Sequence, residues 1–338
     1  MSGRTLFRIA VLRRRPVIRL GIVLCALVLP FGCVSDRQAV TDTRHEETWQ
    51  PWQVVETRTG RALSTSEWLR DLKHYDIVYL GEEHFNNYHI EAALRVLDRL
   101  VSAGVRPTIG MEMFGWDGQQ ALDDYLSNDR LARSQFLEQV RWKQNWGGAF
   151  EAYEPLVAFA RDHRLSIRAM NPPKPLIRRV VKQGLEQVQR DPEWATWGMR
   201  YEEIVDDPAY RARIVDQLRR CHGGGTDDSY RMMYEASMVR DEGMAKTLAT
   251  SLGELRRGDL DSHPVIVSYT GSGHIQYNLP IPKRVARRLS DDVKQITIYL
   301  TSFDVSRTKE VEDLVRERIA DYVWLTPMSG KGPPRPCR

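Results

Sequence analysis

Three short segments place histidine or carboxylate side chains directly after runs of apolar residues. The segments are Gly81-Glu82-Glu83-His84, Met111-Glu112-Met113 and Gly271-Ser272-Gly273-His274. Neutral imidazoles and a carboxylate are the usual ligands of a divalent metal ion, and the same groups can act as base, acid and orienting carboxylate. The sequence therefore predicts that His84, Glu112 and His274 share a site. The spacing of residues along the sequence does not decide whether the side chain of Glu82 or that of Glu83 points into this site.

The apolar runs before these segments are predicted to be buried strands. Short runs rich in β-branched residues alternate with longer amphipathic stretches, which is typical of βα units and a mostly parallel sheet. Ligands bind beyond the carboxyl ends of such strands, and Gly81 and Gly271 permit sharp exits there. The predicted strands are Asp76–Leu80, Pro107–Met111, Ser166–Met170, Pro264–Tyr269 and Gln295–Leu300.

Apolar residues spaced three and four apart predict the helices between these strands. The fold class that follows is α/β, with a mostly parallel central sheet flanked by helices, in one domain over residues 51–327. Residues 172–255 contain no predicted strand, so we interpret them as a helical cap inserted between the third and fourth strands. The predicted helices are Tyr88–Val101, Gly118–Leu126, Tyr153–Arg161, Ile177–Gln189, Tyr210–Arg219 and Tyr230–Leu252.

Residues 1–33 have the features of a bacterial export signal. Six arginines precede an apolar run of twelve residues, Leu20–Phe31, which as a helix would rise about 18 Å and is too short to span a membrane. The segment ends at Gly32-Cys33 and resembles a lipobox. Cys33 is therefore either a lipidated anchor or a plain cysteine beside a conventional cleavage site. The Arg14-Arg15 pair also loosely resembles a twin-arginine signal.

The distribution of charge along the chain argues against a nucleic-acid-binding protein. The formal net charge is +4, but residues 1–33 supply six arginines and no acidic residue, so the rest of the chain is slightly acidic. A broad nucleic-acid-binding surface is therefore not expected.

The two ends of the predicted domain are joined to polar segments. Residues 34–50 are interpreted as a tether, and residues 328–338 as a flexible tail. Cys221 and Cys337 form either one disulfide or two unpaired thiols.

The order of the motifs resembles that of the ChaN-like haem-binding lipoproteins, within the wider Tiki/TraB/erythromycin-esterase-like superfamily. The resemblance extends from about residue 54 to about residue 300. It is carried by Ile77–His84, Gly110–Phe114, Tyr153–Leu156, Ile167–Asn171, Arg240–Ala245 and Gly271–His274.

The resemblance implies a lipoprotein of the bacterial cell envelope, anchored to the outer membrane or facing the periplasm, with a role in haem or iron uptake. Carried over by motif, the residues of the ancestral active site are Glu82, His84, Glu112 and His274. Phe85 stands where family members often have an aspartate, so any role of that carboxylate is absent here.

The motifs and the resemblance lead to two functional hypotheses, a binding protein and an enzyme. The first is a haem-binding protein, which could be a homodimer, in which a tyrosine or histidine holds the iron. Tyr269 and Tyr277 are chosen as candidate ligands because they lie near the second histidine motif. The alternative is a hydrolase or peptidase whose divalent metal ion is held by His84, Glu112 and His274, with Glu82 or Glu83 transferring protons.

Overall fold

The structure is a computed structural model that describes residues 49–127, 131–221, 223–258 and 263–330. These residues belong to one compact unit. The predicted export signal, the lipidation site at Cys33, most of the tether, Cys337 and residues 331–338 lie outside the described ranges. Within those ranges, no helix has the length and apolar character needed to cross a membrane.

The core of the fold is an eight-stranded sheet with the order β2-β1-β8-β7-β3-β6-β4-β5. The five neighbouring strands β7, β3, β6, β4 and β5 are parallel, and β8 runs parallel to β7. Within the described ranges, the antiparallel pairs are those of β1 with β2 and with β8. The strands are β1 (Val54–Glu56), β2 (Ala62–Leu63), β3 (Ile77–Glu82), β4 (Thr108–Gly115), β5 (Ile167–Asn171), β6 (Ile266–Gly271), β7 (Gln295–Ser302) and β8 (Tyr322–Thr326).

The predicted fold class is confirmed, and the five predicted strands are β3 to β7. Each predicted strand other than the last begins one or two residues early, and all five end one to four residues early. The early ends have one cause: the strands continue into polar residues, and both Glu82 and Glu112 lie within strands. Strands β1, β2 and β8 were not predicted. Strands β1 and β2 are only three and two residues long. Strand β8 follows the β7–α13 unit and is as long as β5, so its apolar run was a signal that the sequence reasoning overlooked.

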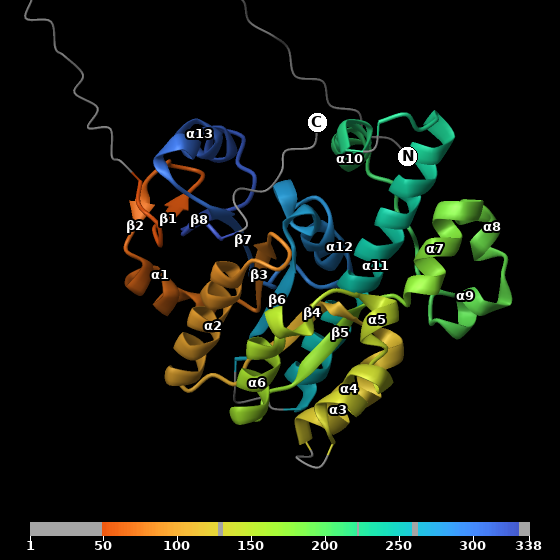
Figure 1. Cartoon of the computed structure of the whole chain (residues 1–338), viewed down its shortest axis with the longest axis horizontal. Helices are drawn as coiled ribbons and strands as arrows, with labels where there is room; N and C mark the ends of the chain where they lie inside the picture. The colour runs from red at the N-terminus through yellow and green to blue at the C-terminus, as the bar shows by residue number, and fades with distance from the viewer. Residues whose placement is uncertain (1–48, 128–130, 222, 259–262, 331–338) are drawn as a thin grey trace, which may run out of the picture. The chain divides into compact units, whose positions relative to one another are not determined.

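Helices cover both faces of the sheet because the strands are apolar on both faces. Val78 and Leu80 of β3 pack in the core on one face with α2, α3 and α6, whereas Ile77 and Tyr79 pack on the other with α11 and α12. Figure 1 shows α2 and α6 on one side of β3 and α11 and α12 on the other. The first face carries α1 (Thr65–Asp71), α2 (Asn87–Ser102), α3 (Gln119–Ser127), α4 (Arg133–Gln139), α5 (Trp142–Asn145) and α6 (Glu154–Asp162).

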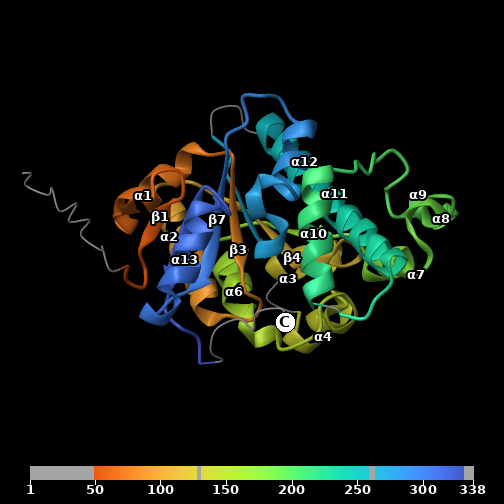
Figure 2. The same ribbon diagram turned by 90° about the horizontal axis from the view of Figure 1, so that it is seen from above.

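The second face carries α11 (Asp227–Gly258), α12 (Ile281–Arg288) and α13 (Thr308–Arg316). Between β5 and α11 lie α7 (Lys174–Gln183), α8 (Leu185–Gln189), α9 (Pro192–Thr196) and α10 (Pro208–Cys221). Figure 2 shows α7, α8 and α9 beyond α11 as seen from β3.

The predicted helical insertion needs one correction. Its last helix, α11, is not part of a separate cap, because Leu248 and Leu252 pack in the same core as Ile77 and Ile266 of the sheet. The carboxyl half of α11 is therefore part of the layer that covers the sheet. Its position beside β5 and β6 brings the middle of the helix to the carboxyl ends of the strands.

We expect Gly243→Ala to lower the free energy of unfolding by about 1–3 kcal/mol, because the added methyl group overpacks the contact of α11 with Pro172 and Trp116, which directly follow β5 and β4. A Cβ at position 243 would meet the rigid ring of Pro172 and would lie 3.0 Å from Trp116. Urea unfolding measures the change. Gly253→Ala on the same helix is the control, since its nearest neighbour is the flexible Arg257 side chain at 3.5 Å. It should instead stabilise the fold by about 0.5–1 kcal/mol, and equal effects of the two variants would contradict the packing argument.

Candidate functional site

The three segments singled out in the sequence lie at or near the carboxyl ends of three adjacent strands, with Glu82 as the last residue of β3 and Glu112 inside β4. Strand β6 lies between β3 and β4, and Glu82 of β3 is in register with Gly271 of β6. Glu112 lies one residue beyond Met111, which is in register with Tyr269 of β6. The carboxyl ends of parallel strands are at the same edge of the sheet, so segments almost two hundred residues apart meet at one rim.

The first half of the site is a hydrogen-bonded pair of Glu82 and His84. The Glu82 carboxylate is fully buried and accepts a 2.8 Å hydrogen bond from Nδ1 of His84. The hydroxyls of Tyr153 and Tyr269 donate to the same carboxylate, each at 2.8 Å. Burial raises the pKa of Glu82, although these hydrogen bonds partly offset the effect.

His84 presents its ring to the surface, with 42% of its side chain exposed. The edge of the ring meets Trp146 at a centroid distance of 4.8 Å. Burial lowers the pKa of His84, but the hydrogen bond to Glu82 and the charge of Glu112 outweigh it, so the net shift is upward. Asn86 begins α2 by accepting a hydrogen bond from the backbone N–H of Tyr88, and this cap fixes where the chain leaves the site.

The second half of the site is a network around the buried carboxylate of Glu112. One of its oxygens accepts hydrogen bonds from Arg240 of α11 and, at 3.2 Å, from Nε2 of His274. The other accepts a 2.7 Å hydrogen bond from the backbone N–H of Gly271. Burial alone would raise the pKa of Glu112, but His274 and Arg240 hold it well below its usual value.

His274 is held between two carboxylates. Its Nδ1 lies 2.6 Å from Asp241 of α11, which also accepts a hydrogen bond from Tyr210. Only 15% of the His274 side chain is exposed. Burial lowers its pKa, yet the charges of Glu112 and Asp241 dominate and raise the pKa to about 9. His274 is therefore a buried cation at neutral pH, with both ring nitrogens engaged.

Gly271 allows the two halves to approach each other. A Cβ at this position would lie 3.0 Å from Nε2 of His84 and 3.4 Å from Oε2 of Glu112. Nε2 of His84 and Oε2 of Glu112 are therefore separated by at most the sum of their distances from this Cβ position. The backbone of Gly271 has a φ of −57°, so glycine is needed here for space rather than for its conformation.

Comparison with known families gives a match over residues 68–285 to the family described as "Haem-binding uptake, Tiki superfamily, ChaN". The match covers more than half of the chain. The chain belongs to the ChaN family. The predicted resemblance is thereby confirmed, and no curated protein matches this ChaN family member.

A solved structure shares the fold. The ChaN protein of Campylobacter jejuni, whose structure describes cofacial haem binding, is 16% identical with a TM-score of 0.59; the match covers 80% of this chain and 95% of that chain. The erythromycin esterase EreC is 15% identical with a TM-score of 0.40, covering 75% of this chain and 76% of that chain. At these identities, the first likeness shows the fold alone.

The predicted divalent-metal site needs a correction. Among the described residues, no three histidine, cysteine or carboxylate side chains are arranged to hold a metal ion. The physical reason is that the donors are already used: both nitrogens of His274 face carboxylates, and Arg240 binds the Glu112 oxygen that a metal would need. A guanidinium at this position supplies the positive charge, so the residues of this ChaN family member do not fit a divalent ion.

The hydroxyls of the two tyrosines predicted as haem ligands are already engaged in hydrogen bonds within the protein. Tyr269 is 1% exposed and its hydroxyl donates to Glu82 inside the cluster, so it is out of reach of a haem outside the protein. The hydroxyl of Tyr277 donates to Glu317 at 2.8 Å, and the Arg213 guanidinium lies 3.4 Å from its ring centre. Tyr269 is thus corrected from a ligand to a hydrogen-bond donor within the site.

Sequence reasoning missed Arg240, Asp241 and Tyr153 as parts of the site. The available signal was the Arg240-Asp241-Glu242 triplet, which places charges on a stretch of α11 that is otherwise buried. The structure also separates the two adjacent glutamates. Glu82 enters the cluster, whereas Glu83 is bonded to Asn86 and Ser302 beside it.

Proposed function

We propose that this ChaN family member binds haem in the bacterial cell envelope, with His84 as the ligand of the iron. The observation that carries the proposal is the hydrogen bonding of the two ring nitrogens of His84. Its Nδ1 donates to the buried carboxylate of Glu82, and none of the described residues forms a hydrogen bond with its Nε2. In the neutral imidazole this arrangement leaves the Nε2 lone pair free.

Glu82 is suited to tune such a ligand. A carboxylate that accepts the Nδ1 proton of a metal-binding histidine fixes the tautomer and raises the basicity of the other nitrogen. Tyr153 and Tyr269 hold that carboxylate from the other side and limit its movement. Haem, when bound, supplies an iron with free axial positions, and the redox and binding properties of that iron depend on the basicity of its ligand.

The surroundings of His84 also fit a porphyrin with two propionates. The indole N–H of Trp146 is buried beside His84 and has no hydrogen-bond partner among the described residues. Such an orphaned donor is costly unless an acceptor from a ligand reaches it. Arg240 is already paired with Glu112, but Lys174 lies close enough to Arg240 for their charges to interact and forms no ion pair among the described residues, so Lys174 is positioned to neutralise a propionate.

We expect His84→Ala to weaken haemin binding at least tenfold, because loss of an axial bond removes more than about 1.4 kcal/mol of binding free energy. Titration of haemin into the purified protein, followed by the Soret band, measures the affinity and the type of ligand. The proton on His84 competes with iron, so its raised pKa predicts that affinity falls as the pH decreases.

Two variants sharpen this test. His163→Ala removes an exposed histidine that packs on Phe159 and should leave the titration unchanged. Tyr277→Phe tests the remaining tyrosine candidate. A Soret spectrum identical to that of free haemin would refute haem binding, whereas tight binding that is lost only in Tyr277→Phe would move the ligand away from His84.

We also propose that the chain is attached to the envelope by a lipid at Cys33 and that two copies face each other across the haem sites. The export signal ending in Gly32-Cys33 and the half-exposed His84 support these proposals. Labelling of cells with a radioactive fatty acid should mark the wild-type protein and leave Cys33→Ala unlabelled. Equal labelling of both would contradict the anchor, and a haem-loaded protein that sediments as a monomer would contradict the dimer.

A further inference from the structure

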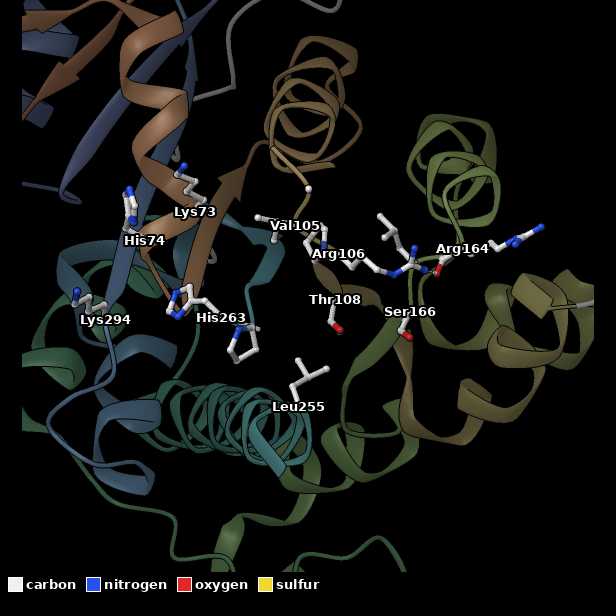
Figure 3. Close-up of a pocket in the computed structure, with 14 residues that line it drawn as sticks. Lys73, His74, Val105, Arg106, Thr108, Arg164, Ser166, Leu255, His263 and Lys294 are labelled. Carbon is white, nitrogen blue, oxygen red and sulfur yellow. Dashed lines mark hydrogen bonds between the residues drawn. The ribbon is translucent and has the colours of Figure 1, made fainter. Parts of the chain in front are cut away.

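A cavity lies at the end of the sheet opposite His84. Its volume is about 860 Å³, and its lining comes from the segments that precede β3, β4, β5, β6 and β7, together with Leu255 of α11. Figure 3 shows these segments around the opening. We call it the amino-end pocket, because it is formed at the amino ends of the parallel strands.

The amino-end pocket is strongly basic. Its lining includes the permanent cations Lys73, Arg106, Arg164 and Lys294 in addition to two histidines, and none of the described residues that line it is acidic. This charge is local, because the chain beyond residue 33 has 43 basic and 45 acidic side chains. Among the described residues, no carboxylate forms an ion pair with these four cations, and a group of cations around one concave surface makes the electrostatic potential there more positive, which favours anions.

The nearest buried carboxylate does not neutralise this charge. Asp76 is almost fully buried, and one of its oxygens pairs with Arg256 at 2.9 Å. Its other oxygen accepts the backbone N–H of Lys294 at 2.7 Å. Asp76 is therefore satisfied by its own partners, and the side chains of Lys73 and Lys294 remain available to a ligand.

The pocket also contains groups that fix and complement an anion. Arg106 donates a 2.8 Å hydrogen bond to the carbonyl of Arg164, which restrains its guanidinium at the edge of the pocket. Figure 3 shows the hydroxyls of Thr108 and Ser166 projecting into the space that Leu255 faces from α11. The polar groups thus lie next to an apolar wall.

We propose that the amino-end pocket binds a phosphate-bearing ligand that also carries an apolar group. Arginine, lysine and hydroxyl groups form charge-assisted hydrogen bonds with phosphate oxygens, and the apolar wall accepts a hydrocarbon or ring. The volume of the pocket is in the range of small-molecule sites, roughly 300–1,000 Å³. A soluble organic phosphate and the head group of an anionic phospholipid share this chemistry.

Isothermal titration calorimetry of the purified protein with inorganic pyrophosphate tests whether the pocket binds the phosphate group of the proposed ligand. The double variant Arg106→Gln/Lys294→Gln removes two charged donors to the phosphate oxygens, so it should bind pyrophosphate at least tenfold more weakly. Lys182→Gln, an exposed lysine on α7 far from this lining, is the matched control and should change nothing. Urea unfolding of each variant shows that the fold is retained.

Vesicles separate the two sources of phosphate. Binding to vesicles of phosphatidylcholine with phosphatidic acid, but not to phosphatidylcholine alone, assigns a lipid head group if pyrophosphate fails to bind. Pyrophosphate binding assigns a soluble ligand. The proposal is overturned if neither probe binds, or if Lys182→Gln weakens binding as much as the double variant. The haemin titration of the double variant should equal that of the wild type, so this outcome is independent of the haem proposal.

Discussion

Glu112→Gln should lower the free energy of unfolding by about 3–5 kcal/mol at neutral pH. Glu112 is the only carboxylate among the described residues that contacts both Arg240 and His274. Removing its charge leaves Arg240 without a carboxylate partner and leaves His274 with Asp241 alone, so the buried network keeps one positive charge that is not compensated. The amide keeps the shape of the glutamate side chain, so the loss would report the charge rather than a cavity.

Equilibrium unfolding in urea measures this change, and pH supplies an internal check. The pKa of Glu112 is lower in the folded state than its ordinary value of 4.5. Its contribution is therefore present above pH 4.5 and is lost as the pH falls through the folded-state value, so the difference between wild type and variant should shrink in acid.

Glu254→Gln is the matched control for this substitution. It removes a carboxylate whose ion pair with Arg168 is at 3.2 Å and about half exposed. Such a surface pair should contribute no more than about 1 kcal/mol. A Glu112→Gln variant as stable as Glu254→Gln would show that the buried network is not a stabilising unit.

The protein should lose roughly 3 kcal/mol of stability as the pH rises from 6.5 to 9, because His274 is held in its charged form. Its pKa is raised from 6.5 to about 9 in the folded state. Since the folded-state value is the higher one, the stabilisation is complete below pH 6.5. It decreases as the proton leaves His274 and is gone above about pH 9.

Unfolding curves at a series of pH values, with His274→Gln as the reference, isolate this contribution from other groups that titrate in the same range. The slope of stability against pH should be steeper in the wild type than in the variant. Asp241→Asn should reduce the slope as well, because it removes one of the two carboxylates that raise the pKa of His274. Parallel curves for wild type and His274→Gln would contradict the assignment of the proton.

The fold could be predicted to a large extent because its signals are local. Runs such as Ile77–Leu80 are apolar at every position, which is expected only of strands covered on both faces. The amphipathic stripe of α2 is equally local, and its predicted bounds differ from those observed by one residue at each end. Strands β1 and β2 are three and two residues long and form by pairing with distant β8 and with each other, so nothing in their own sequence distinguishes them, whereas the apolar run of β8 is a local signal that was missed.

The sequence by itself determined which residue types follow the strands, and the rule for parallel sheets made it reasonable to place His84, Glu112 and His274 at a common rim. The tertiary structure alone decided how those groups are used. The position of α11 brings Arg240 and Asp241 to Glu112 and His274. Whether a carboxylate binds a metal ion or a guanidinium depends on which cation the fold places within hydrogen-bonding distance, and that depends on helix packing rather than on spacing along the chain.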